Sequence, residues 1–459
     1  MDDSDPHPLT AARRTRGLSQ TTLAVRVRQA AARRGLRSGC DRSRIRKWER
    51  GVAPDADSQL YLAEALGLPP EAVAIPWPHW LHNNPDGVVL LTPHSAVPAL
   101  REALIPVERR AFLTLSGAGL TGLAGQWASA PSAAALDATA GPPGTDESLI
   151  DLLRDSVDHL TAAGPAHEQH TTKLLAAHLD TVTDMLETGG HRPATLQQLH
   201  DLAAELAHTL AWRHFDHGAH PLAARYWMAA LHNTHALGDT DRSAGLISDL
   251  AYQAAWRNDH TLAQDLLAHA LTRAHHPAAR SLLNLRLARS LAASPTPVRT
   301  PALRALRAAE HDLNRAGADR PAWCSWMSEA DLAVDTGQTL LDLGDTRPAR
   351  QLLTQGEHLL PATRDKTRGI FLAYQAANYL AHHDIEPAAH AATAALDLAR
   401  RIHAPRCEQL VQSLTPAFRP YAHHHAVERL LHLAGCSYRG CLQPAQCDLD
   451  RLSGSNSAR

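Results

Sequence analysis

The sequence predicts an all-α protein with two parts, a small N-terminal bundle of short helices and a long α-solenoid of stacked helix pairs. Three observations predict this class. From residue 147 to residue 434 the apolar residues recur with helical periodicity, and runs typical of strands are absent. Similar segments recur at regular intervals within that region. Residues 9–75 read as short helices separated by tight turns.

The length of 459 residues predicts more than one domain. Composition and turn residues divide the chain into a head of short helices, a connector with an apolar helix and a flexible Pro/Ala/Gly linker, a repeat region, and a tail. The predicted boundaries are 1–75, 76–146, 147–434 and 435–459.

Charge is distributed unevenly along the chain. Residues 1–50 carry thirteen Arg or Lys against five Asp or Glu, a balance of +8. The remainder carries 32 against 42, a balance of −10, so the near-neutral total conceals a basic head on an acidic body. This asymmetry predicts an anionic partner for the head alone.

Glycine, proline and capping residues mark the predicted helix boundaries in the head. Gly17 interrupts the first predicted helix, and Ser19 is placed to cap a second. Two further helices follow residue 55, with Ser58 and the pair Pro69-Pro70 marking their boundaries.

Residues 41–51, "DRSRIRKWERG", carry five basic side chains and one apolar pair. On a helix with about 100° between residues, Ile45 and Trp48 share one side. Asp41 is a suitable N-cap, and Gly51 provides a stop. The segment is therefore either a solvated charged helix or a helix that is buried on one face and meets a polyanion on the other. The residues of the cationic side, with Arg44 at its flank, are Arg42, Ser43, Arg46 and Lys47.

Residues 9–75 resemble the Cro/repressor-type (XRE) helix-turn-helix family through "RGLSQTTLA", "SRIRKWERG" and "LAEALGL". The resemblance implies that the helix containing "KWERG" lies in the major groove of double-stranded DNA. Arg42, Ser43 and Lys47 match positions that touch bases, and Gln20 matches one that touches phosphate. Arg44 is expected on phosphate, and Arg46 belongs to the same DNA-facing side.

The same resemblance implies a structural ion pair between Arg13 and Glu49. Such a pair would offset an unfavourable interaction, because Glu49 lies near the C-terminal end of its helix, where the dipole disfavours an anion. One departure from the family is an insertion, "RQAAARRGLRSG", before Arg42. It offers Arg33, Arg34 and Arg37 as further phosphate contacts.

Five segments of the repeat region align, with starts 40, 40, 46 and 39 residues apart. Each predicts one helix of a pair, and several follow a turn such as "RND", "LGD" or "HHD". The segments begin at His220, His260, Thr300, Thr346 and Ile385. Four of them carry a small residue at the fourth position, which allows close helix packing: Ala223, Ala263, Ala349 and Ala388.

This region looks like the tetratricopeptide-like sensor half of bacterial regulators, with units longer than the usual 34 residues. We expect this region to sense a peptide, a small molecule or a protein, and to form a homodimer, because heads of this kind bind palindromic operators in pairs. Aromatic residues cluster in the first repeats, where they form either inter-helix core or an aromatic-lined ligand groove. They are Trp212, Tyr226, Trp227, Tyr252 and Trp256.

The segment 109–130 begins with two arginines followed by an uncharged apolar run, with the predicted helix at 111–130. It imitates an export signal, but its internal position favours an apolar helix packed within the protein. It also looks like the interdomain helix of actinobacterial regulators with this layout. We expect no membrane contact.

The sequence offers no metal site or enzyme motif. "HEQH" at residues 167–170 has the wrong spacing for a zincin, and Cys436, Cys441 and Cys447 lack C-x-x-C spacing. No nucleophile elbow or Gly-rich phosphate loop is present, so we expect neither an enzyme nor a cofactor. Scattered cysteines without a secretory signal predict reduced thiols in a cytoplasm.

Two functions fit these patterns. The first is a sequence-specific transcriptional regulator whose helical repeats dimerise and sense an effector. The second is a protein-interaction scaffold that uses its repeats, with DNA binding secondary. The matching residues in the head favour the first.

Overall fold

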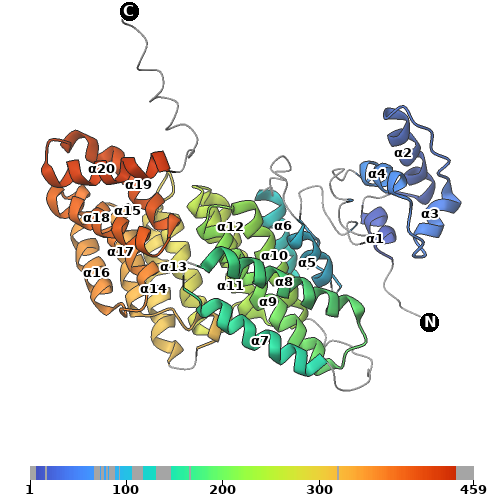
Figure 1. The fold of residues 1–459 in the computed structure, drawn as a ribbon, viewed down its shortest axis with the longest axis horizontal. Coiled ribbons are helices and arrows are strands. Elements are labelled where there is room, and N and C mark those ends of the chain that lie inside the picture. The colour runs from blue at the N-terminus through green and yellow to red at the C-terminus, as the bar shows by residue number, and fades with distance from the viewer. Residues whose placement is uncertain are drawn as a thin grey trace, which may run out of the picture. The chain divides into compact units, whose positions relative to one another are not determined.

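The computed structural model describes residues 7–15, 18–66, 73, 77–78, 81, 88–92, 94–105, 117–130, 146–164, 167–317 and 320–440. Regular structure in these ranges is helical apart from a single bridge residue at Val89, which confirms the all-α helical-repeat class (Figure 1). None of the helices in the same ranges combines the length and apolarity that crossing a bilayer requires.

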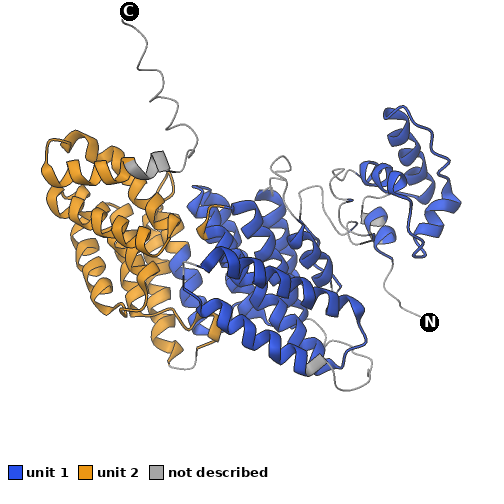
Figure 2. Ribbon diagram, viewed as in Figure 1, with its two compact units in different colours: residues 1–215, 219–286 blue, residues 216–218, 287–459 orange. Residues whose placement is uncertain are grey.

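The chain divides into two compact units (Figure 2). Unit 1 contains residues 1–215 and 219–286, and unit 2 contains residues 216–218 and 287–459. Unit 1 therefore holds the head, the connector and the first repeats, whereas unit 2 holds the later repeats.

The head has four described helices, and side-chain caps begin three of them. Ser19 accepts a hydrogen bond from the Thr22 amide at 3.0 Å, as predicted. Asp41 caps the next helix through the Arg44 amide at 2.8 Å. Asp55 caps the fourth helix. The predicted boundary at Ser58 is therefore wrong, because Ser58 lies inside the first turn, where its amide donates to Asp55. The helices are α1 (Pro8–Thr15), α2 (Gln20–Arg33), α3 (Arg42–Trp48) and α4 (Ala56–Ala65).

The inserted segment lengthens α2 and forms the loop before α3. Gly35, at a φ of 74°, follows α2, and the Leu36 amide donates to the Ala31 carbonyl at 3.0 Å. A left-handed glycine after a helix closes the last turn in this way. Arg28 then ties the loop to α2 by donating to the Cys40 carbonyl at 2.6 Å. The loop is thus held in place just ahead of α3.

The connector contributes two described helices, α5 (Ala96–Leu104) and α6 (Gly117–Ser129). The predicted apolar helix at 111–130 corresponds to α6, although its residues 111–116 lie outside the described residues. The predicted linker, 131–146, lies outside them except for Asp146, and so does Pro69-Pro70. Both connector helices pack on repeat helices, α5 on α8 and α10, and α6 on α12.

Antiparallel helix neighbours build the repeat region. In unit 1, α11 packs against both α10 and α12, and in unit 2, α15 packs against α16 and α17 against α18. The helices that begin in unit 1 are α7 (Asp146–Ala162), α8 (Glu168–Thr188), α9 (Pro193–Asp216), α10 (His220–Ala236), α11 (Thr240–Trp256), α12 (His260–Leu271) and α13 (Pro277–Ala292). Unit 2 continues with α14 (Arg299–Ala316), η4 (Ala322–Cys324), α15 (Glu329–Asp342), α16 (Thr346–Leu359), α17 (Asp365–Ala381), α18 (Ile385–Arg401), α19 (Pro405–Phe418), η5 (Arg419–Tyr421) and α20 (His425–Gly440).

The five aligned segments coincide with α10, α12, α14, α16 and α18, each within one residue of a helix start. The four small residues at the fourth position are all fully buried, as close helix packing requires. Two turns of the repeat region, the one before α11 and the one before α12, also share a geometry. Gly238 and Asn258 adopt φ values of 70° and 63°, and the next residue in each case, Asp239 or Asp259, caps the following helix.

The last helix passes the predicted end of the repeats at residue 434 and continues to Gly440. The backbone of Cys436 therefore belongs to α20, whereas Cys441 and Cys447 lie outside the described residues. The other three cysteines, Cys40, Cys324 and Cys407, are buried thiols.

Candidate nucleic-acid interface

Helix α3 has one buried face and one exposed cationic face. Ile45 and Trp48 lie in the head core together with residues of α1, α2 and α4. The other five side chains of the helix are exposed, which is the division that the helical projection predicts. They are Arg42, Ser43, Arg44, Arg46 and Lys47.

Arg13 and Glu49 lie together, as the family resemblance implies. Arg13 Nε donates to Glu49 Oε1 at 2.7 Å, and the two side chains are only 12% and 8% exposed. Arg13 Nη1 also donates to the Leu18 carbonyl at 2.7 Å, immediately before the cap of α2. One guanidinium therefore joins α1, the start of α2 and the end of α3.

Gln20 extends this network to the exposed face. Its Nε2 donates to Glu49 Oε2, and its Oε1 accepts a hydrogen bond from Arg42 Nε at 3.3 Å. The sequence resemblance suggested phosphate contact for Gln20 and did not reveal this bridge. The bridge engages Arg42 through its Nε and not through its two terminal nitrogens.

The start of α3 is fixed by Asp41. Its carboxylate accepts from the Arg44 amide and from Ser43 Oγ, both at 2.8 Å, and these hydrogen bonds lower the pKa of Asp41. Ser43 is thereby engaged locally, while the guanidinium of Arg44 lies beside Gly39 of the inserted loop. Arg44 is therefore at the edge of the cationic face, not at its centre.

None of the ion pairs among the described residues involves the four cations of α3. The inserted arginines behave differently. Arg33 and Arg34 pair with Glu64 at 2.7 and 3.2 Å, and the hydrogen bond from Arg33 lowers the pKa of this carboxyl. Their proposed role as phosphate contacts is therefore weakened, because binding DNA would break an existing pair. Arg37 is exposed and forms no such pair among the described residues.

The aromatic residues of the first repeats divide into two groups. Trp227 and Tyr226 are buried, with Trp227 packed edge-on against Trp212 at 5.4 Å and Tyr226 stacked on His214 at 5.3 Å. These two are inter-helix core. The other three, Trp212, Tyr252 and Trp256, are half-buried and remain candidates for ligand contact.

A polar network borders this aromatic group. Arg286 Nη1 donates to Asp249 Oδ1 at 2.7 Å, and His208 Nε2 lies 2.8 Å from Asp249 Oδ2. Burial opposes ionisation of Asp249, but Arg286 and His208 outweigh it and lower the pKa of Asp249. Trp212 Nε1 also reaches His208 Nε2, at 3.0 Å. A single imidazole nitrogen cannot both donate to Asp249 and accept from Trp212, so whether Nε2 of His208 carries a hydrogen decides between the two bonds.

The sequence analysis did not single out this network. The repeat spacing could have pointed to it, because His208, Asp249 and Arg286 are about one repeat apart on α9, α11 and α13. No group of three or more His, Cys, Asp and Glu side chains in the described ranges could hold a metal ion.

The head is similar to a known protein family. A family described as the SP15 N-terminal domain matches residues 9–68. The matched segment contains α2, α3 and α4 and nearly all of α1, the four helices that carry the cationic face. No curated protein matches the chain.

Proposed function

We propose that the chain is a sequence-specific DNA-binding transcriptional regulator that reads double-stranded DNA with α3. The observation that carries the proposal is the exposed face of α3, four cations without an ion-pair partner in the described part of the chain. A largely buried ion pair and two buried apolar side chains anchor the helix that carries this face. Solvated helices usually interleave both signs of charge, which this face does not.

The individual roles follow from position. Arg42 is the best placed to read a base edge, since its terminal nitrogens can form the two-pronged contact that guanine accepts. Lys47 and Arg46 share its side of the helix. Arg44, beside the inserted loop, is assigned to phosphate, and Gln20 is assigned to the orientation of Arg42.

Dimerisation and sensing are assigned to the repeats. Two heads of this kind bind half-sites about 34–36 Å apart, so a dimer contact must set their spacing. The half-buried aromatic group with Asp249 and Arg286 is the proposed contact for a peptide or small-molecule effector. Such an effector would alter DNA affinity by a coupling free energy of typically 1–3 kcal/mol.

The second candidate function is a scaffold that binds proteins through the repeats. Fluorescence anisotropy of the full chain on random and selected DNA duplexes separates the two functions. The regulator account predicts a preferred sequence and an affinity that falls steeply with salt. Equal, weak binding to every duplex would favour the scaffold.

A further inference from the structure

Helix α5, between the head and the repeats, is held by small side chains. Among its fully buried apolar residues only Leu100 is large, and the others are Ala96, Pro98, Ala99 and Ala103. Burial of a methyl group stabilises far less than burial of a leucine or aromatic side chain. The apolar contribution to the docking of α5 on α8 and α10 is therefore modest.

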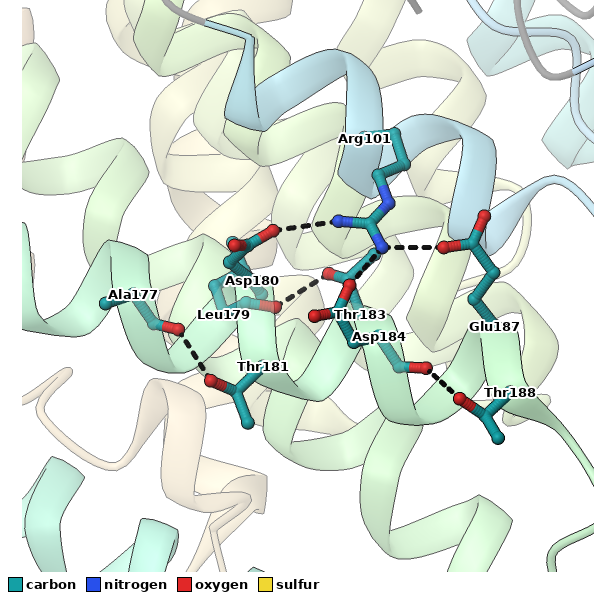
Figure 3. Close-up of polar contacts among 9 residues, drawn as sticks. All are labelled: Arg101, Ala177, Leu179, Asp180, Thr181, Thr183, Asp184, Glu187 and Thr188. Carbon is teal, nitrogen blue, oxygen red and sulfur yellow. Dashed lines mark hydrogen bonds and ion pairs between the residues drawn. The ribbon is translucent and has the colours of Figure 1, made fainter. Parts of the chain in front are cut away.

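The outer edge of α5 is attached to α8 by one arginine (Figure 3). Arg101 Nη1 donates to Asp180 at 2.8 Å, and Nη2 donates to Glu187 at 2.6 Å and also to Asp184. The three carboxylates are 58%, 38% and 66% exposed, respectively. Ion pairs in such exposed positions are screened and individually weak, so the contact depends on several of them acting together.

The inner edge of α5 meets α10 through buried polar groups. Ser95 Oγ lies 2.6 Å from His232 Nδ1, and Arg225 Nε lies 3.8 Å from Glu102 Oε1, with all four residues under 9% exposed. Buried ionic and polar contacts fix the register of a helix but add little net stability, because desolvation offsets the attraction.

The same turn of α10 also contacts α9 and α11. His232 bonds to Ser95, its neighbour Asn233 accepts through Oδ1 from His200 Nδ1 of α9 at 2.8 Å, and Thr234 bonds to Ser243 of α11 at 2.8 Å. These three consecutive residues reach the start of α5, α9 and α11 respectively. Helix α10 is thus bonded to α9 and α11 at the same turn where it holds the start of α5.

The second connector helix provides a contrast. Helix α6 buries Leu120, Leu123 and Trp127 against the repeats. Arg273 lies over the Trp127 ring, 5.1 Å from its centroid, and donates to the Trp127 carbonyl at 2.5 Å. Large apolar and aromatic side chains therefore hold α6, whereas α5, which is nearer to the head in sequence, is held mainly by small, polar and charged ones.

We propose that the face formed by α8 and α10 is a helix-docking surface, that α5 is its resident occupant, and that α5 detaches from it as a unit while α6 and the repeats stay folded. Detachment releases α5 from the surface of the repeats. The regulatory meaning of this motion, a change in how tightly the head is coupled to the repeats, rests on the proposed DNA binding.

Hydrogen exchange on the full chain without DNA tests this proposal, so its outcome does not depend on whether α3 reads DNA. In the wild type, α5 amides should exchange at least about tenfold faster than those of α6 and α10, as expected for a separate unit of low local stability. Arg101→Ala and Glu102→Gln should each accelerate the amide exchange of α5 further and leave the exchange of α10 unchanged. Arg307→Ala, which removes an exposed arginine on α14, is the control and should change neither.

Two results would overturn the proposal. One is wild-type exchange of α5 at the same rate as α10, and the other is a parallel acceleration of α5 and α10 in Arg101→Ala. Either would make α5 a permanent part of the repeat array.

Discussion

Arg13 and Glu49 meet at 2.7 Å between α1 and the residue that follows α3, and Glu49 also accepts a hydrogen bond from Gln20. The same carboxylate thus anchors the end of α3 and, through Gln20, orients Arg42 on the exposed face of that helix. Stability of the head and its proposed DNA readout therefore depend on one largely buried residue.

Glu49→Ala should destabilise residues 1–66 by about 2–4 kcal/mol, because it leaves the Arg13 guanidinium buried without its partner. Urea denaturation followed by tryptophan fluorescence measures the change. Glu64→Ala is the matched control, since it breaks pairs with Arg33 and Arg34 that are more exposed and worth roughly 0–1 kcal/mol. Equal effects of the two substitutions would show that burial does not distinguish these ion pairs.

Arg42→Ala should remove discrimination at one base pair, costing about 1–3 kcal/mol on the preferred duplex and little on others. Gln20→Ala should reproduce part of this loss, because Arg42 loses the group that orients it. Arg44→Ala should weaken binding to all sequences alike and reduce the salt dependence by about one unit of slope. Anisotropy titrations over a salt series measure all three. A uniform, sequence-independent loss in every variant would refute the assignment of roles.

Gly356→Ala should destabilise unit 2 by about 1–3 kcal/mol despite the better helix propensity of alanine. A Cβ at this position of α16 would lie 2.9 Å from the Ala330 carbonyl oxygen of α15, and it would overlap Val334. Gly435→Ala in α20 is the control, because nothing lies within 4 Å of its added Cβ. Thermal unfolding followed by circular dichroism should show a lower midpoint for the first variant only.

Alkaline pH should destabilise unit 1 through Tyr226. Burial raises the pKa of Tyr226 to about 12 in the folded chain. The contribution of Tyr226 to the free energy of unfolding is fully present below its unfolded pKa of about 10. It is lost progressively as the pH rises towards the folded pKa, and the loss reaches about 2 kcal/mol at pH ~11.5. Tyr226→Phe should therefore lose less stability than the wild type between pH ~8 and pH ~11.5. Identical losses in urea denaturation would contradict this account.

Local chemistry made several features predictable from sequence. The caps Ser19 and Asp41, the buried pair Ile45 and Trp48, and the repeat helices that start near His220 and His260 all follow from short-range patterns. The Arg13–Glu49 pairing could be expected only through resemblance to a family, since no local rule joins residues so far apart in sequence.

Contacts between distant segments were not predictable. Whether Arg33 and Arg34 face DNA or Glu64 depends on how α4 packs beside α2, which the sequence of the insertion does not specify. The docking of α5 depends on side chains of α8 and α10 more than seventy residues away in sequence. A choice between Ser58 and Asp55 as the cap was equally open, because both residue types accept hydrogen bonds from amides.

The most direct test of the central claim is selection of DNA by the full chain. Genomic fragments retained by the purified protein should share one sequence motif, with two half-sites related by symmetry, and Arg42→Ala should alter the preferred base at one position of each half-site. Retained fragments without a common motif, or an Arg42→Ala variant that selects the same motif as the wild type, would contradict DNA reading by α3.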